Sequence, residues 1–238
     1  KPSSPGVEWV KPEKNLADFQ QAMERADLRR IVFSSSATVY GDPAVVPIPE
    51  TAPLTATNPY GRSTLMCEDA LRELFAADPR WQIAILRYFN PVGAHESGLI
   101  GESPNGVPNN LMPYITQVAS GHREYLQIFG NDYPTLDGSC IRDYVHVQDV
   151  ADAHLLAVRA LKTDSLPGAL NIGTGKGLSV FEVLDAMQTY LGTQAEIKIK
   201  PKREGDPASL IANVDLAWKY LGFRARRNLE EMVSTTYP

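Results

Sequence analysis

Cysteine is scarce in this chain, whose 238 residues include two, Cys67 and Cys140. Two thiols are too few for a disulfide framework or a structural zinc site, and this usage is typical of a reducing cytoplasm. The sequence also has no apolar run long enough to span a membrane, and the residues that follow Lys1 lack the apolar stretch of a signal peptide. The net charge of −5 argues against a general nucleic-acid-binding surface. We therefore expect a cytoplasmic protein that binds no metal, nucleic acid or membrane.

Glycine-rich phosphate loops are missing too. The nearest candidate is Gly173-Thr-Gly-Lys-Gly177, which has neither P-loop nor GxGxxG spacing. We predict a turn there, between a strand and a helix that the capping box Ser179-Val-Phe-Glu182 begins. His146 and Asp149 stand three residues apart, and a helix cap at Asp149 explains them better than a metal site does.

The first part of the chain carries an α/β pattern. The apolar run Ile31-Val-Phe33 ends in three serines and is typical of a buried parallel strand. Helices are predicted over residues 15–27 and 60–78, and a second apolar strand over 82–90. Strand, helix and strand at this spacing predict a right-handed parallel crossover. Between them, residues 41–59 form a long proline-rich loop, of a kind that is often functional.

Shorter elements follow the second predicted strand. We predict helices over 110–121, 149–161, 179–192 and from Asn228 onward, and strands over 126–129, 141–147, 170–172 and 196–200.

Hydroxyl groups gather where the first predicted strand ends. Ser34, Ser35 and Ser36 lie at its carboxyl end, where open α/β sheets bind their ligands. Tyr60 opens the helix that follows. A serine near a tyrosine, with a lysine one helical turn later, can move a hydroxyl proton while a hydride goes to a nicotinamide. The lysine position here holds Thr64.

Seven motifs in this order resemble one family. They are S-S-S-A-T-V-Y-G, N-P-Y-G-R-S, L-R-Y-F-N-P-V-G-A-H, N-N-L-M-P-Y-I, I-F-G-N-D-Y-P-T-L-D-G, R-D-Y-V-H-V and K-R-E-G-D. From about Asn15 onward the chain is similar to the UDP-galactose 4-epimerase (UDP-glucose 4-epimerase) family of extended short-chain dehydrogenases. The family's opening strand and Gly-rich loop have no counterpart before Arg30, so we expect an N-terminally truncated relative.

The resemblance implies an α/β fold with a Rossmann-like parallel sheet and a smaller substrate-binding domain. Residues 1–90 would form a partial NAD-binding domain and 91–238 the UDP-sugar domain, with about 141–173 returning to the main sheet. The implied enzyme is an isomerase of galactose metabolism, a homodimer that interconverts UDP-galactose and UDP-glucose through transient oxidation at C4 by bound NAD.

The same resemblance assigns the site residues. Tyr60 would be the catalytic base and Ser36 would bind the sugar 4-hydroxyl. The family's lysine, here Thr64, would hold the nicotinamide ribose and favour the ionised tyrosine. The implied cofactor-binding residues are Ser34, Ser35, Tyr60, Tyr88, Phe89 and Pro91. The implied substrate-binding residues are Asn90, Asn109, Asn110, Phe129, Arg142, Arg203 and Asp206. Leu210 matches the position that limits the size of the sugar.

Three alternatives stay open on the sequence alone. Arg142 and Arg203 could form surface ion pairs with Asp143 and Glu204 instead of binding a diphosphate. A degenerate relative could bind UDP-sugars without catalysis. A sugar-nucleotide 4,6-dehydratase would need an acidic pair where this chain has Ala37 and Thr38.

Overall fold

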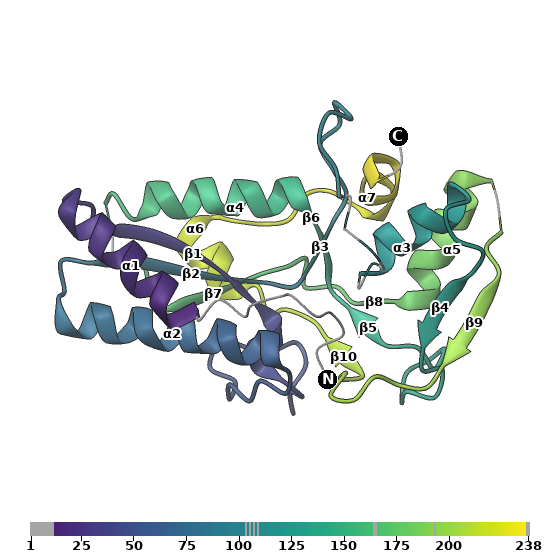
Figure 1. Cartoon of the computed structure of the whole chain (residues 1–238), viewed down its shortest axis with the longest axis horizontal. Helices are drawn as coiled ribbons and strands as arrows, with labels where there is room; N and C mark the ends of the chain where they lie inside the picture. Colours follow the sequence, from purple (N-terminus) through teal and green to yellow (C-terminus); the bar gives the residue numbers. More distant parts are fainter. Residues whose placement is uncertain are drawn as a thin grey trace.

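The computed structural model describes residues 12–102, 104, 106, 108, 110–163, 166–192 and 194–236, with side chains from residue 18 onward. One part of the molecule is a layered α/β unit, in which a parallel sheet lies between α4 on one side and α2 on the other (Figure 1). The other part contains the three short helices α3, α5 and α7 and three small sheets among its described residues. No helix among the described residues is long and apolar enough to cross a membrane.

The layered unit is built on strands β1, β2 and β7. Their order in the sheet is β1-β2-β7 and both pairings are parallel, with Arg30 opposite Gln82 and Ser36 opposite Tyr88. This confirms the predicted parallel crossover. The bounds in this unit are α1 Pro12–Arg25, β1 Arg30–Ser36, the 3-10 helix η1 Ala37–Tyr40, α2 Pro59–Ala77, β2 Gln82–Tyr88, α4 Val147–Ala160, β7 Ala169–Ile172 and α6 Asp215–Leu221.

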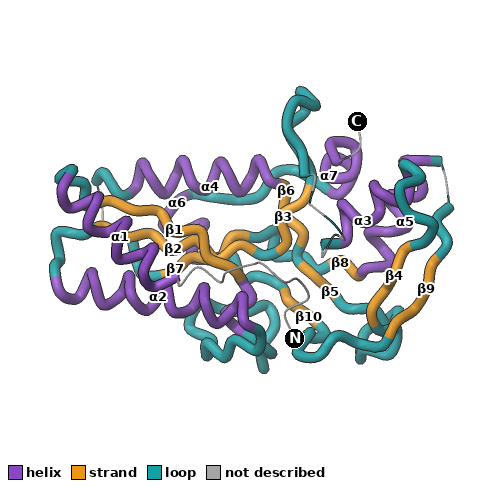
Figure 2. The backbone as a smooth tube through the Cα atoms, viewed as in Figure 1, coloured by secondary structure: helices purple, strands orange, loops and turns teal. Residues whose placement is uncertain are grey.

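The second part follows the end of β2. Strands β3 and β6 pair in parallel, β4 pairs with β9, and β5 lies between β8 and β10 (Figure 2). The bounds are β3 Asn90–Val92, α3 Leu111–Ala119, β4 Leu126–Phe129, β5 Ile141–Arg142, β6 Tyr144–His146, β8 Leu178–Ser179, α5 Val180–Leu191, β9 Ile197–Lys200, β10 Ser209–Leu210 and α7 Leu229–Thr236.

Three buried clusters hold these parts together. One cluster joins β2 and β7 to α4 and α6 and includes Leu86 and Leu170, both fully buried. A second lies among α3, α5, β4 and α7, around Ile115 and Leu184. The third surrounds η1 and contains Phe89. Because this third cluster takes residues from η1, β10 and the end of β2, it fixes the two parts against each other.

Two of the expected elements differ in detail. Helix α4 begins at Val147 and is capped by His146, whose ring nitrogen accepts a hydrogen bond from the Gln148 amide. The prediction that Asp149 caps this helix was therefore wrong. Asp149 lies in its first turn and instead accepts bonds from the Arg226 and Arg227 amides.

The predicted strand over 141–147 is split at Asp143. The backbone of Asp143 donates to Leu210 and accepts from Asn90, so the chain changes its pairing partner there. The buried Asp143 carboxylate accepts hydrogen bonds from the amides of Thr174, Gly175 and Ala212. These bonds fix the Gly173–Gly177 turn. The capping box at Ser179 is present as predicted, and α5 ends at Leu191 with Gly192 as its C-cap.

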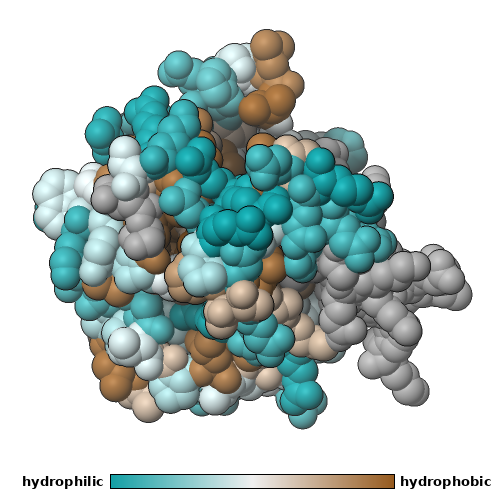
Figure 3. Space-filling view, turned by 90° about the vertical axis from the view of Figure 1, so that its left-hand side faces the viewer, coloured by the Kyte–Doolittle hydropathy of each residue, from teal (hydrophilic) through white to brown (hydrophobic). Residues whose placement is uncertain are grey.

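The loop between β3 and α3 projects from the body at the top of Figures 1 and 3. It exposes two large apolar side chains, Leu99 at 87% and Ile100 at 68%. The remaining surface seen in Figure 3 mixes hydrophilic and hydrophobic residues in small patches.

Candidate functional site

A cavity of about 690 Å³ opens at the carboxyl ends of β1 and β2, between the two parts of the molecule. Open α/β sheets bind ligands at this edge. Its walls come from η1, the start of α2, the segment after β2, the start of α3, strand β4 and the loop before β10. Among the predicted site residues, those that line it are Ser36, Tyr60, Tyr88, Phe89, Asn90, Pro91, Asn110, Phe129, Arg142, Arg203 and Asp206.

Ser36 and Tyr60 reach this cavity through a tight turn and a helix start. The Ser36 hydroxyl caps η1 by accepting bonds from the Thr38 amide and hydroxyl, at 3.2 and 3.0 Å. Asn58 caps α2, so Tyr60 lies in its first turn and remains 60% exposed. A β-carbon at Gly61 would lie 2.7 Å from the Thr38 carbonyl oxygen. Glycine at position 61 therefore lets α2 approach the Ser36 turn closely.

Ser34 and Ser35 lie outside the cavity wall. Ser34 is 3.0 Å from His154 Nε2, on the α4 side of the sheet. Ser35 donates to Glu68 on the α2 side. Successive side chains of a strand point to opposite faces, and only Ser36, at the strand's end, turns into the cavity. The role of Ser34 and Ser35 in cofactor binding stays a prediction.

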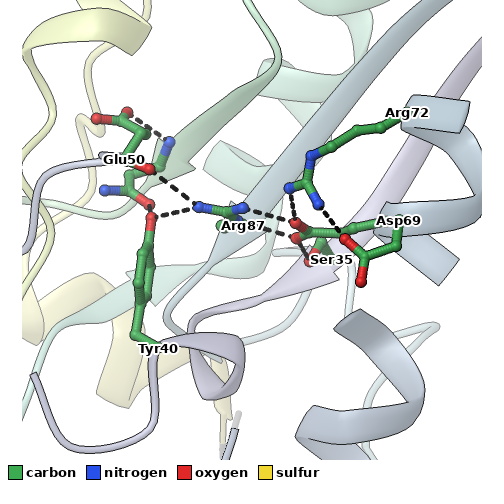
Figure 4. Close-up of polar contacts among 8 residues, drawn as sticks. Ser35, Tyr40, Glu50, Asp69, Arg72 and Arg87 are labelled. Carbon is green, nitrogen blue, oxygen red and sulfur yellow. Dashed lines mark hydrogen bonds and ion pairs between the residues drawn. The ribbon is translucent and has the colours of Figure 1, made fainter. Parts of the chain in front are cut away.

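A buried polar network joins Ser35, the residue before Ser36, to Glu68 and Arg87 (Figure 4). Arg87, at 1% exposure, donates to both Glu68 oxygens, at 2.9 and 2.6 Å. It also donates to the Tyr40 hydroxyl at 3.0 Å. Tyr40 in turn donates to the Asn171 side chain on β7. The network therefore ties η1, α2, β2 and β7 to one guanidinium.

The charges in this network are balanced. Burial by itself would raise the pKa of Glu68, but the hydrogen bonds and charge of Arg87, together with Ser35 and Arg72, hold it below its usual value. Glu50 has a raised pKa because burial outweighs its hydrogen bond from the Asn171 amide. Glu68 is thus the ionised partner of Arg87, and the pair fixes the turn that presents Ser36.

Thr64 is buried, one turn after Tyr60. Its hydroxyl donates to the Tyr60 carbonyl oxygen at 3.0 Å. Such a bond satisfies the hydroxyl inside its own helix. A threonine carries no charge, so it supplies no cation to the Tyr60 phenol.

The opposite wall of the cavity carries two arginines with different partners. Arg142, on β5, forms an ion pair with Asp206 and donates to the Ile141 carbonyl oxygen. Arg203 has its guanidinium carbon 4.0 Å from the centre of the Phe129 ring. The ion pairs considered for these arginines with Asp143 and Glu204 are not present among the described residues. Asp143 is instead occupied by backbone amides.

Two asparagines complete this wall. Asn90 follows β2 and its amide donates to the Asp143 carbonyl oxygen at 2.9 Å. Asn110 stands before α3, and its side chain donates to Glu102 at 3.2 Å. Asn109 lies outside the described residues. Helix amino termini attract phosphate oxygens, so the start of α3 adds to the anion-binding character of this wall.

The inner wall is aromatic. Tyr88, Phe89 and Pro91 continue from β2, beside Ser36. Their role in holding the nicotinamide end of a dinucleotide stays a prediction. Among the residues that the structure describes, no Gly-rich strand–helix turn is present for the pyrophosphate, and no group of three or more metal-binding side chains occurs.

Some lining residues were not singled out from the sequence. Tyr144 and Cys140 face the cavity and are buried, and burial raises the pKa of both groups. The signal for Tyr144 was its place in the Arg-Asp-Tyr motif beside Arg142. Glu102 lies in the long Gly- and Pro-rich segment, where no periodic pattern could indicate which side chain turns inward.

Comparisons with known proteins show the family to which the chain belongs. Residues 15–173 match the NAD dependent epimerase/dehydratase family. The chain is 50% identical over 217 residues to a UDP-glucose 4-epimerase of Bacillus subtilis. This match covers 91% of this chain and 64% of that protein. It is equally identical to a bifunctional UDP-glucose 4-epimerase and UDP-xylose 4-epimerase 3 of Arabidopsis thaliana, covering 90% of this chain and 62% of that protein.

A solved structure is similar over most of the fold. It is a UDP-glucose-4-epimerase from Stenotrophomonas maltophila with bound NAD and formylated UDP-arabinopyranose, with a TM-score of 0.91 and 47% identity. The match covers 95% of this chain and 67% of that one. The chain thus spans a little under two thirds of the length of the two curated relatives.

Proposed function

The chain belongs to the NAD dependent epimerase/dehydratase family, and on that premise we propose that it binds a UDP-sugar and serves the interconversion of UDP-galactose and UDP-glucose. The observation that carries this is the cavity itself. It brings a hydroxyl pair, Ser36 and Tyr60, opposite two arginines, Arg142 and Arg203. One wall suits proton transfer at a sugar hydroxyl, and the other suits a diphosphate.

The proposed roles follow from these positions. Arg203 and Arg142 hold the diphosphate, and Asp206 accepts a hydrogen bond from a ribose hydroxyl. The sugar then reaches across the cavity toward Ser36 and Tyr60. Tyr60 takes the proton of the 4-hydroxyl, and Ser36 orients that hydroxyl. NAD, when bound against Tyr88, Phe89 and Pro91, supplies the acceptor and later the donor of the C4 hydrogen, so the net redox change is zero.

Binding and turnover test this proposal separately. Calorimetric titration of the chain with UDP should show saturable binding, tighter than with UMP, because the second phosphate adds charge for the arginines. Incubation with UDP-galactose and NAD, followed by chromatographic separation of UDP-glucose, measures epimerisation. A folded sample that binds no UDP would overturn the proposal.

A second candidate is UDP-sugar binding without turnover. Thr64 favours it, since no charged side chain occupies the position one turn after Tyr60. Saturable UDP binding with no product from UDP-galactose would support this candidate over the first.

We also propose that the protein acts in the cytoplasm as a homodimer. The scarcity of cysteine supports a reducing compartment. Helices α1 and α2 expose Phe19, Met66 and Phe75, each between 45 and 53%. Such apolar groups favour a self-association surface. Sedimentation of the purified chain gives its mass in solution, and a monomer at all concentrations would refute the dimer.

A further inference from the structure

A segment without a helix or strand carries part of the cavity wall that holds the two arginines. It runs from residue 201 to residue 208, between strands β9 and β10. The residues of this segment that line the cavity are Arg203, Gly205, Asp206 and Pro207. Its second half is tied to β5, since Asp206 forms an ion pair with Arg142. The position of its first half depends on other contacts, and Lys202 supplies three of them.

The ammonium of Lys202 contacts a neighbouring turn in these three ways. It donates to the Asp132 carbonyl oxygen at 2.9 Å and lies 3.2 Å from the carboxylate of the same residue. It also lies over the Tyr133 ring, 4.6 Å from the ring centre. We call these contacts the Lys202 clamp. The Asp132 side chain is 73% exposed, and an exposed ion pair contributes little, so the carbonyl oxygen and the ring provide most of the attachment.

Gly130 makes room for the Lys202 clamp. Its backbone has a φ of 83°, and a β-carbon there would lie 2.6 Å from the Tyr133 ring and 2.7 Å from the Lys202 side chain. Its amide donates to the Lys200 carbonyl oxygen at 2.8 Å, at the point where β9 ends. Glycine at position 130 therefore lets the ring and the lysine stem meet against the backbone.

The turn that receives Lys202 is itself fixed. The Tyr133 side chain is buried, at 7% exposure. Asp137 accepts hydrogen bonds from the Ser139 amide at 2.9 Å and from the Ser179 hydroxyl at the start of α5. The clamp therefore connects the first half of the segment to a turn that α5 holds in place.

We infer that Lys202 is a positioning residue, which holds its segment so that Arg203 and Asp206 face the UDP-sugar before it binds. Preorganisation of this kind increases affinity, because less conformational entropy is lost on binding. In the described part of the chain, Lys202, Asp132 and Tyr133 do not line the cavity, so Lys202 acts through the segment and not as a phosphate ligand. This inference rests on the proposed function.

The first test removes the charge of Lys202 and keeps most of its stem. UDP affinity is measured by calorimetry for the wild-type chain, Lys202→Met and Lys202→Arg. Lys202→Met should weaken UDP binding about 3- to 10-fold, the scale of a cation–π contact. Its melting temperature should change little, because the side chain is partly exposed. Lys202→Arg should stay within about 2-fold of the wild type, since a guanidinium can make the same contacts. Wild-type affinity in Lys202→Met would overturn the inference.

A second test separates the clamp from the electric field of the ammonium. Tyr133→Leu removes the ring without changing any charge, and it should also weaken UDP binding about 3- to 10-fold. In this background Lys202→Met should cost less than about 2-fold, because the clamp is already broken. Tyr133→Phe removes a buried hydroxyl that has no hydrogen-bond partner among the described residues, so it should bind UDP like the wild type. Equal losses from Lys202→Met in the two backgrounds would overturn the inference.

A charge reversal at Asp132 gives opposite predictions for the two explanations. Asp132→Lys adds positive charge near the cavity and repels Lys202. If Lys202 acted on the diphosphate through its charge alone, this variant would bind UDP more tightly than the wild type. Loss of the clamp instead predicts binding that is about 3-fold weaker. Tighter binding would overturn the inference.

Lys198 provides a matched control on β9. It lies 3.4 Å from the Glu196 carboxylate and 3.6 Å from the centre of the Tyr125 ring, in similar contacts outside the cavity wall. Lys198→Met should leave UDP affinity unchanged. If Tyr133→Leu does not fold, the comparison of Lys202→Met with Lys202→Arg decides alone.

The outcomes also separate the two claims. A wild-type chain that binds no UDP refutes the proposed function, and this inference with it. A wild-type chain that binds UDP no more tightly than Lys202→Met refutes only the inference.

Discussion

The two walls of the cavity differ in the partners that their side chains have. We call the wall with Arg142 and Arg203 the nucleotide wall, and the wall with Ser36 and Tyr60 the hydroxyl wall. On the nucleotide wall, Arg142 forms an ion pair with Asp206, and Arg203 lies over the Phe129 ring. On the hydroxyl wall, Thr64 is uncharged, and β1 pairs on one side only among the described residues. Under the proposed function, we therefore expect UDP-sugar binding to depend on the nucleotide wall and the chemistry to depend on the hydroxyl wall, so that each can be changed without the other.

Strand exposure shows the same contrast. Parallel strands are usually buried on both faces. Strand β7 is buried throughout, whereas β1 is exposed or half-buried over its first five residues. The network around Arg87 lies beneath this open strand and ties it to α2. It is therefore the main polar restraint on the hydroxyl wall.

The largest expected effect comes from breaking that restraint. Arg87→Met leaves Glu68 buried with less compensation, and we expect the free energy of unfolding to fall by about 3–5 kcal/mol, measured by urea denaturation. Glu68→Leu combined with Arg87→Met should recover most of it, because no charge remains buried. Arg80→Met, in an exposed pair with Asp78, is the control and should not change stability. A loss no greater than that of the control would show that the Arg87 network is dispensable.

The next effect concerns Thr64. In a fusion that supplies the part of the Bacillus subtilis relative not spanned here, Thr64→Lys should raise the rate of UDP-galactose epimerisation at pH 7 by about a hundredfold. An ammonium that favours the ionised phenol by about 2.7 kcal/mol gives that factor.

Two outcomes define this test. Tyr60→Phe should abolish the gain, since no phenol is left to ionise. A fusion with Thr64 that turns over as fast as its Thr64→Lys version would show that another group activates Tyr60. UDP affinity should be the same in all three, which keeps the nucleotide wall separate from the chemistry.

A smaller effect is expected at the open edge of β1. Leu28 precedes this strand and is 57% exposed. An exposed apolar edge favours association, and a lysine there opposes it. Leu28→Lys should reduce light scattering of concentrated samples severalfold, with a change in unfolding free energy within about 0.5 kcal/mol. Equal light scattering by the wild type and Leu28→Lys would show that Leu28 does not drive association.

Sequence patterns predicted the layered half well because its strands and helices are long. The run at Ile31 and the five prolines after Gly41 fixed β1, the loop and α2 within a few residues. The patterns did not indicate that Arg87 would be buried, since an arginine inside an apolar strand carries no sign of its partners. The sequence does not distinguish Ser34, Ser35 and Ser36. In the structure, Ser34 contacts α4, Ser35 contacts α2 and Ser36 lines the cavity.

The short strands β8 and β10 and helix α6 were not predicted. They have two to seven residues, too few for a period to appear, and long-range pairing with β5 decides the strands. The stack of Arg203 on Phe129 has the same origin, because β4 and β9 pair across about 70 residues of sequence. The motifs predicted many of the residues that line the cavity, while the contacts among them required the fold.

The smallest expected effect tests whether α7 is held by a neutral histidine. His146 is fully buried, caps α4 through one ring nitrogen and lies 2.9 Å from the Thr235 hydroxyl through the other. Burial, with Arg227, lowers its pKa below the usual value, while Asp149 and Glu231 act in the opposite direction. The unfolded chain therefore binds a proton more readily than the folded one. The stabilisation is present above about pH 6.5 and is lost as the pH falls toward the folded pKa. It amounts to about 1.4 kcal/mol for each unit by which the folded pKa lies below the unfolded pKa.

His146→Asn keeps a capping side chain but cannot titrate, so its unfolding free energy should change less with pH between 7 and 5 than that of the wild type. Parallel pH profiles for the two proteins would show that His146 does not control this stability.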